Sequence, residues 1–241
     1  MAAGIVLTLM LAAQSAFADI PSDLTVAADK SLPQSSRQSA FDRIVSEGAR
    51  DPALVVQASR AGDDTPTRWV AIRALGHIGG PQSRDALLGL LEDPEPAIRT
   101  AAVGAMGELG ERAYSHRIAE MLSDPAVIVR AAAAETAGSL RDPSLIPALE
   151  AALSSQDSYY RGNSLWVRQH YVAALGAIGD MRALPVLLKA LDDPDPNVAD
   201  VSLRALEQLS GISFADGRDP VTEREAWRRW ATAQIQQRGI R

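Results

Sequence analysis

The sequence lacks cysteine altogether, and it carries none of the short motifs that mark common catalytic sites. Without thiols the chain has no disulfide, zinc knuckle or cysteine nucleophile. It also has no Gly-x-Ser-x-Gly elbow, no glycine-rich phosphate loop ending in Gly-Lys-Ser/Thr and no His-Glu-x-x-His pair. These absences predict no catalytic residue, no cofactor and no metal centre.

An excess of positive charge is also missing. Thirty Asp and Glu residues outweigh 24 Lys and Arg residues, which gives a net charge of −6. A protein that binds nucleic acid needs the opposite sign, because its affinity comes largely from phosphate contacts. We therefore expect no nucleic-acid partner. One weaker alternative stays open, a surface that binds an anionic polymer through the six arginines of the last 25 residues.

The longest apolar run, from Ile5 to Ala18, falls short of the roughly 20 residues that a bilayer span needs. It ends in small residues at Ala16 and Ala18, a pattern typical of a secretory signal. We predict a signal peptide over 1–18, an exported protein of the periplasm or cell envelope, and no membrane span after cleavage. No Lys or Arg precedes the run, which leaves open a start further upstream or an uncleaved anchor.

Residues 19–37 are rich in Pro, Ser and Asp and show no sustained period. This composition predicts a flexible leader. After it, we expect an N-terminal capping helix and a degenerate first repeat helix within 38–64.

A 31-residue repeat organises most of the remaining chain. Gly76, Gly107 and Gly138 stand 31 residues apart, and Gly176 follows after 38. Apolar residues recur at intervals of three and four within segments of about 12 residues, which is typical of amphipathic helices. Each repeat therefore holds two helices, A and B.

The ends of the helices are marked by proline and glycine. Asp-Pro stands between helices A and B at 93–94, 124–125 and 193–194, where proline lacks the N–H that a continuing helix needs. Gly79 and its equivalents stand where helix B must end, because glycine tolerates positive φ. Gly76 and its equivalents lie inside helix B and predict close packing of neighbouring helices, against a cost of about 1 kcal/mol in helix propensity.

One repeat column is charged, with arginine near the start of helix B in four successive repeats. Arginine opposes the macrodipole at a helix N-terminus, so partners must hold it there. Asp93 and Asp124 each precede an arginine of this column by six residues. We predict a structural ladder, with a ligand-binding row of arginines as the alternative. Its members are Arg68, Arg99, Arg130, Arg168, Asp93 and Asp124.

Two segments carry a resemblance to a known family. The segments DPEPAIRTAAVGAMGELG, from Asp93, and VRQHYVAALGAIGD, from Val167, are similar to bacterial HEAT repeats of the phycobilisome-lyase type. The resemblance covers about Asp51 to Gly211. It implies an all-α fold, a right-handed α-solenoid of about five HEAT-like helix pairs with one concave surface, which we assign to 65–211.

The resemblance also suggests enzymatic relatives that this sequence does not match. HEAT-type deoxyhypusine hydroxylases carry repeated His-Glu pairs that hold two irons, whereas His77, His116 and His170 are followed by Ile, Arg and Tyr. Phycobilin lyases act on cytoplasmic light-harvesting proteins, which does not fit an exported chain. DNA-glycosylase solenoids need a basic groove, which the net charge of −6 does not favour.

The last segment, 212–241, is similar to one that often closes bacterial HEAT-repeat proteins. The similarity lies in LSGISF at 209–214 and EAWRRW at 225–230. Trp227 and Trp230 fall on one helical face, where two large rings can cover the apolar end of the last repeat. We predict a structural cap, with an aromatic binding site as the alternative.

The repeat departs from its spacing once, through seven extra residues that place an insertion at 154–166. Loops on rigid repeats often bind partners, and Tyr, Trp and Arg are enriched at interface hot spots. The alternative is that the aromatic side chains only pack the longer turn onto the repeats. We predict a partner-binding loop formed by Tyr159, Tyr160, Arg161, Asn163 and Trp166.

The sequence as a whole favours a non-enzymatic, exported HEAT-repeat scaffold whose partner is another protein. The alternative is a lyase-like enzyme, or an accessory protein of an enzyme, that binds a cofactor or small molecule in the concave groove.

Overall fold

The computed structural model describes residues 19–60, 64–215 and 219–240. The predicted signal peptide at 1–18 lies outside these residues. The chain divides into two compact units, the first ending at Leu109 and the second beginning at Gly110. No helix of the described residues is long and apolar enough to cross a membrane.

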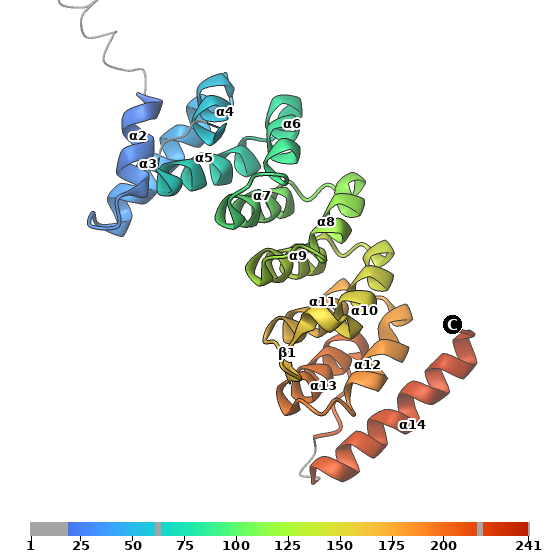
Figure 1. Ribbon diagram of the computed structural model, residues 1–241. Coiled ribbons are helices and arrows are strands. Elements are labelled where there is room, and N and C mark those ends of the chain that lie inside the picture. Colours follow the sequence, from blue (N-terminus) through green and yellow to red (C-terminus); the bar gives the residue numbers. More distant parts are fainter. Residues whose placement is uncertain (1–18, 61–63, 216–218, 241) are drawn as a thin grey trace, which may run out of the picture. The chain divides into compact units, whose positions relative to one another are not determined.

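The first unit begins with two N-terminal helices, and two helix pairs follow them along the chain (Figure 1). In each pair an A helix precedes a B helix: α4 pairs with α5, and α6 with α7. The central helix is α5, which packs against α2, α3, α4, α6 and α7. Its apolar face is buried through Val70, Ile72 and Leu75. The helices of this unit are α2 (Ile20–Ala28), α3 (Gln34–Gly48), α4 (Ala53–Arg60), α5 (Thr65–Ile78), α6 (Gly80–Leu90) and α7 (Pro96–Leu109).

The structure corrects the predicted flexible leader at 19–37. Most of this segment is helical, because it forms α2 and the first turn of α3. Ile20 and Leu24 lie one helical turn apart and are buried, and Asp23 beside them forms an ion pair with Arg43 of α3 at 2.5 Å. The helix is only nine residues long, so its two apolar anchors were too few to show a period in the sequence.

The second unit contains three further helix pairs, α8 with α9, α10 with α11 and α12 with α13. The B helices α9, α11 and α13 pack side by side in one row, and the A helices α8, α10 and α12 pack against this row (Figure 1). Together the two units contain the five predicted helix pairs. The helices of this unit are α8 (Ser115–Met121), α9 (Val127–Leu140), α10 (Ile146–Ser154), α11 (Val167–Ile178), α12 (Leu184–Ala190), α13 (Pro196–Ser210) and α14 (Pro220–Arg238). Short 3-10 turns are η1 (Arg112–Tyr114), η2 (Pro143–Leu145), η3 (Gln156–Ser158) and η4 (Met181–Ala183), and the two short strands are β1 (Tyr159–Tyr160) and β2 (Asn163–Ser164).

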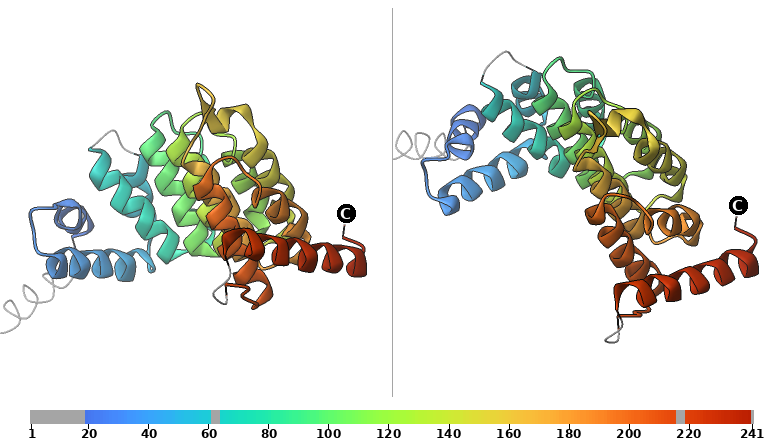
Figure 2. Two further views of the ribbon diagram at one scale, coloured as in Figure 1. Left: turned by 90° about the horizontal axis from the view of Figure 1, so that it is seen from below. Right: turned by 60° about the horizontal axis from the view of Figure 1, so that its bottom comes forward.

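The last helix, α14, packs on α12 and carries the tryptophans assigned to the cap (Figure 2). Trp227 is fully buried. Its ring meets Phe214 edge-on with the ring centres 4.8 Å apart, and Trp230 in the same way at 5.5 Å. Of the tail arginines, Arg228 pairs with Asp192. The aromatic side chains of the tail thus pack on one another, while α14 packs on α12. A capping role for Trp227 and Trp230 stays a prediction.

Glycine serves two distinct purposes in the B helices. At Gly79 and Gly179, which follow the last residues of α5 and α11, φ is +68° and +73°, a region that other residues rarely adopt. Inside α5, a Cβ on Gly76 would lie 2.8 Å from the carbonyl oxygen of Ala105 in α7. The absence of a side chain at Gly76 therefore sets how closely α5 and α7 approach.

This close approach predicts opposite effects of alanine at two helical glycines. Gly76→Ala must push α5 away from the backbone of α7, so we expect its free energy of unfolding to fall by roughly 1–3 kcal/mol. Gly89→Ala, on α6, meets nothing within 4 Å, so we expect it to raise stability by up to about 1 kcal/mol through helix propensity. Chemical denaturation of both variants measures the difference, and equal effects would contradict the packing role of Gly76.

Candidate protein-binding site

The insertion forms a tight β-hairpin between α10 and α11. In the antiparallel pair, Tyr159 faces Ser164 and Tyr160 faces Asn163, which leaves Arg161 and Gly162 as a two-residue loop. Both loop residues have positive φ, +50° and +79°, as in the turns that fit the twist of a hairpin. Figure 2 shows this segment, in gold, extending beyond the helices of its unit in the left view.

The base of the hairpin is tied to the repeats by buried hydrogen bonds. Ser158 is buried, and its hydroxyl donates to the Ala152 carbonyl at the end of α10, at 2.7 Å. The backbone N–H of Leu165 donates across the base to the Ser158 carbonyl at 2.9 Å. On the other strand, the Ser164 hydroxyl is the main cause of a lowered pKa at Asp195, the N-cap of α13. The hairpin is therefore held at both strands.

Arg168 joins the hairpin to two repeats. Its terminal nitrogens donate to both carboxylate oxygens of Asp193, at 3.0 and 2.5 Å, and one of them also donates to the Ser164 hydroxyl at 3.1 Å. Its Nε donates to the Leu153 carbonyl near the end of α10 at 3.3 Å. The ring of Tyr159 lies over the guanidinium, with its centre 4.6 Å from Cζ. Burial by itself would lower the pKa of Arg168, but the hydrogen bonds and charge of Asp193 outweigh burial and raise it.

The tip of the hairpin, by contrast, faces solvent. Tyr160 is 61% exposed, and Arg161 and Asn163 are also exposed. Trp166, which follows the hairpin at the start of α11, is 46% exposed. Arg161 lies over the Tyr160 ring, with Cζ 5.2 Å from the ring centre. The five predicted binding residues thus divide into one that packs, Tyr159, and four that are open to a partner.

The B helices beside the hairpin carry two hollows that share His170. One, of about 510 Å³, lies between α9 and α11, and the other, of about 370 Å³, lies between α11 and α13. His170 meets the Trp166 ring edge-on at 5.0 Å, and its Nδ1 lies 3.2 Å from a carboxylate oxygen of Glu135. Trp166 therefore connects the hairpin to the surface of the B helices. In the described part of the chain, no three His, Asp or Glu side chains converge as a metal site would require.

The arginine column is held as a ladder, but its partners differ from the predicted ones. Arg68 reaches forward to Asp93 of the following repeat, at 2.5 Å, and its Nε donates to the Ser59 carbonyl near the end of α4. Arg99 donates to the main-chain carbonyl of Asp93, six residues earlier, at 2.8 Å. The carboxylate of Asp93 therefore serves the arginine of the preceding repeat.

At Arg130 the insertion changes the pattern. Arg130 donates to the main-chain carbonyl of Asp124, at 2.8 Å, as Arg99 does to Asp93. Its other terminal nitrogen donates to the carbonyl of Asp157, within the insertion, at 2.9 Å. The insertion therefore also supplies an acceptor to a second buried arginine, although the Nε of Arg130 is buried without a hydrogen-bond partner among the described residues.

Sequence reasoning missed Asp193 and His170 as members of this site. Asp193 begins the third Asp-Pro turn, so its place in the same repeat column as Asp93 and Asp124 was a sufficient signal. His170 was considered only as a metal ligand, because its contacts with Trp166 and Glu135 depend on how α9 and α11 pack.

Comparison with known proteins defines the class of protein. A family model described as HEAT repeats matches residues 52–116 and 161–222, which is over half of the chain. The chain therefore belongs to the HEAT-repeat family, and the sequence-based resemblance and the predicted all-α solenoid fold class are confirmed. No curated protein matches the chain.

Among solved structures, the chain is similar to one in the complex of CpcE and CpcF of phycocyanin lyase from Nostoc sp. PCC7120. The identity is 28%, with a TM-score of 0.57, over 67% of this chain and 65% of that chain. This chain thus spans just under two thirds of the length of the lyase chain. Two engineered proteins show the same fold, at 20% identity over 80% of this chain and 89% of theirs, and at 21% identity over 79% and 53%, each with a TM-score of 0.50.

The buried contacts of Arg168 predict a large loss of stability in Arg168→Met. This change leaves the Asp193 carboxylate without its cation and the Leu153 carbonyl without the Arg168 donor, so we expect the free energy of unfolding to fall by about 3 kcal/mol. The matched control is Arg182→Met, which breaks an ion pair with Asp180 in which the arginine side chain is 61% exposed. Exposed pairs contribute little, so we expect a change below about 1 kcal/mol. Equal losses in urea titrations of the two variants would contradict the structural role of Arg168.

Proposed function

We propose that the chain is a non-enzymatic, exported HEAT-repeat scaffold that binds another protein through the hairpin at 159–166. The observation that carries the proposal is the contrast within the hairpin, whose base is tied to buried Arg168 while Tyr160 and Trp166 are exposed. When a partner covers an exposed aromatic side chain, the burial of its large apolar surface contributes strongly to the free energy of binding. Because the backbone of the hairpin is already fixed, little entropy is lost on binding.

The comparisons with known proteins support a protein as the partner, without identifying which protein it is. The lyase chain similar to this one is part of a complex of two proteins, CpcE and CpcF. HEAT repeats also form extended surfaces that suit protein binding. The surface proposed here runs from Tyr160 through Trp166 to His170 and the two hollows of the B helices.

The hairpin proposal predicts site-specific crosslinks. With p-benzoylphenylalanine in place of Tyr160 or Trp166, in cells that naturally make the protein, we expect one crosslinked partner shared by both positions. The same probe at Val221, which is 66% exposed on α14, serves as the control and should not capture that partner. Crosslinks of equal yield at all three positions, or none at 160 and 166, would contradict the proposal.

Affinity for the captured partner then separates binding from packing. We expect Tyr160→Ala and Trp166→Ala each to weaken binding about tenfold or more without changing the melting temperature, as hot-spot residues do. Tyr159→Ala should instead lower the melting temperature, because its ring packs on Arg168.

A second candidate function follows from the 28% identity to the phycocyanin lyase chain. It is a lyase-like enzyme, or an accessory protein of one, that holds a cofactor or small molecule. Absorbance above 300 nm in the protein purified from its natural source, lost on denaturation and filtration, would favour this candidate over the scaffold.

Export is the part of the proposal that rests on the sequence alone. The apolar run from Ile5 to Ala18 supports cleavage after Ala18. We expect the protein isolated from its natural cells to begin at Asp19 and to be found in the envelope fraction. A chain that keeps Met1 and stays with cytoplasmic markers would refute export.

A further inference from the structure

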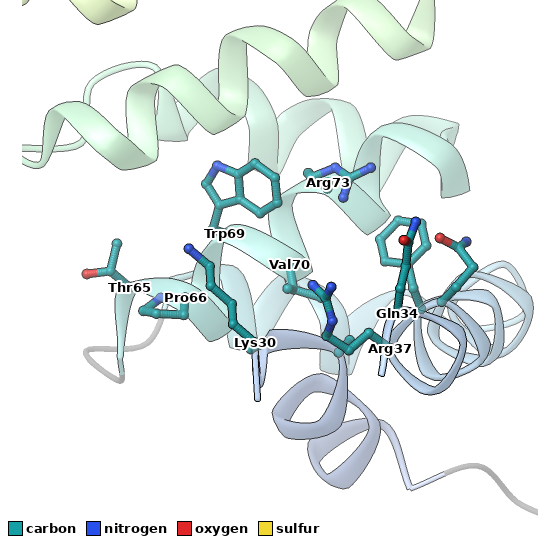
Figure 3. A pocket seen from close by; sticks show the side chains of 12 residues that line it. Lys30, Gln34, Arg37, Thr65, Pro66, Trp69, Val70 and Arg73 are labelled. Atoms are coloured by element: carbon teal, nitrogen blue, oxygen red, sulfur yellow. The ribbon is translucent and has the colours of Figure 1, made fainter. Parts of the chain in front are cut away.

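The first unit contains a cavity of about 710 Å³ that the proposed function does not use (Figure 3). It lies between α3 and α5, and the end of α2 and the α2–α3 connection also line it. Its volume falls in the usual range of small-molecule sites, about 300–1,000 Å³.

The charged side chains that line the cavity are all of one sign. Lys30, Arg37 and Arg73 line it, and none of its twelve lining residues carries a carboxylate. Figure 3 shows that the three side chains come from the α2–α3 connection, α3 and α5, and that they border the cavity at separate places, with the Lys30 amino group beside Trp69. None of them forms an ion pair with another of the described residues. This is a local concentration of positive charge in a protein whose net charge is −6.

Arg37 also has an unused donor. Its Nε is buried and has no hydrogen-bond partner among the described residues. Asp29 is the carboxylate that the charge of Arg37 affects. The pKa of Asp29 is lowered mainly by two hydrogen bonds from Ser31, and the charge of Arg37 contributes less. Those bonds come from the hydroxyl and backbone N–H of Ser31, at 2.7 and 2.8 Å, and both end on Oδ1 of Asp29.

Aromatic rings fix the position of Arg73. Its Cζ lies 5.1 Å from the centre of the Phe41 ring and 5.0 Å from that of the Trp69 ring. Contact with ring faces holds a guanidinium without using its N–H groups, which lie in its own plane. Those donors stay available to an anion in the cavity. Trp69 is 40% exposed and offers a flat apolar wall beside them.

We propose that this cavity binds a small organic anion, a planar ring system that carries a carboxylate, phosphate or sulfonate group. The acidic group would meet Lys30, Arg37 and Arg73, and the ring system would lie against Trp69. Arginine suits such groups because its donors form a fork that matches two oxygens. The site belongs to the first unit, so it does not depend on the hairpin or on the proposed partner.

A second cavity in the same unit has a similar size but a different lining. It has about 630 Å³, lies beside α4 and α6, and is lined by Arg60 and Asp85, whose charges offset each other, without any aromatic residue. It matches the first cavity in size and lacks the features that select an anion with a ring system. Arg60 therefore provides the matched control.

The test uses two dyes with the same ring system. 8-Anilinonaphthalene-1-sulfonate carries an anionic group, and N-phenyl-1-naphthylamine lacks it. We expect the full chain to bind the sulfonate at one saturable site at least tenfold more tightly than the neutral dye, with affinity that falls as salt rises. Arg73→Gln and Lys30→Gln should each weaken sulfonate binding about tenfold, whereas Arg60→Gln should leave it unchanged. Among the described residues, the rings of Phe41 and Trp69 hold Arg73 and not Lys30, so the Lys30 variant stays informative if Arg73→Gln lowers stability.

Competition then identifies the acidic group and the need for rings. Displacement by 2-naphthoate or 1-naphthyl phosphate, at concentrations where inorganic phosphate alone has no effect, supports the proposal and ranks the two acids. Three results would overturn it: equal affinity for the two dyes, equal effects of Arg60→Gln and Lys30→Gln, or full displacement by inorganic phosphate alone.

Discussion

An arginine at the start of helix B links one repeat to the next at Arg68 and Arg168, whose side chains are 11% and 4% exposed. Arg68 and Arg168 both donate through Nε to a carbonyl near the end of the preceding A helix, and both reach forward to the aspartate of the following Asp-Pro turn. A cation is unfavourable beside the start of helix B but favourable beside the end of helix A. Burying this charge is costly, and several simultaneous partners offset the cost. Each of these arginines thus joins helix A and helix B of its own repeat to the Asp-Pro turn of the next.

The insertion uses the same arginines to become part of the stack. Arg130 finds a main-chain carbonyl of the insertion, and Arg168 holds both the Ser164 hydroxyl and the Tyr159 ring. A hairpin that was merely added to a turn would lose entropy whenever it bound a partner. This hairpin is instead held at its base by groups that the repeats need in any case, so its exposed tip is already in place. The proposed binding site and the stability of the repeats therefore share one set of contacts.

Much of this fold could be predicted from sequence because its signals are local and repeated. The Asp-Pro turns, the glycines that end helix B and the apolar columns recur in several repeats, so each supports the others. The helix α2 could not be predicted, because its two buried anchors, Ile20 and Leu24, gain their meaning only from packing. The same limit hid the cationic cavity, because two of its three cations, Lys30 and Arg37, come from the segment predicted as a flexible leader. The hairpin was also hidden, since Arg161 rather than Asn or Gly occupies the first loop position at φ +50°.

The hairpin is ordered in the free protein because Arg168 and its partners hold its base. Amide hydrogen exchange of the full chain tests this claim directly at the N–H of Leu165, which donates to the Ser158 carbonyl. We predict that this amide exchanges as slowly as amides in the middle of α11, and that it loses its protection when Asp193 is replaced by asparagine. Exchange of Leu165 at the rate of an unstructured loop in the unaltered protein would contradict the account.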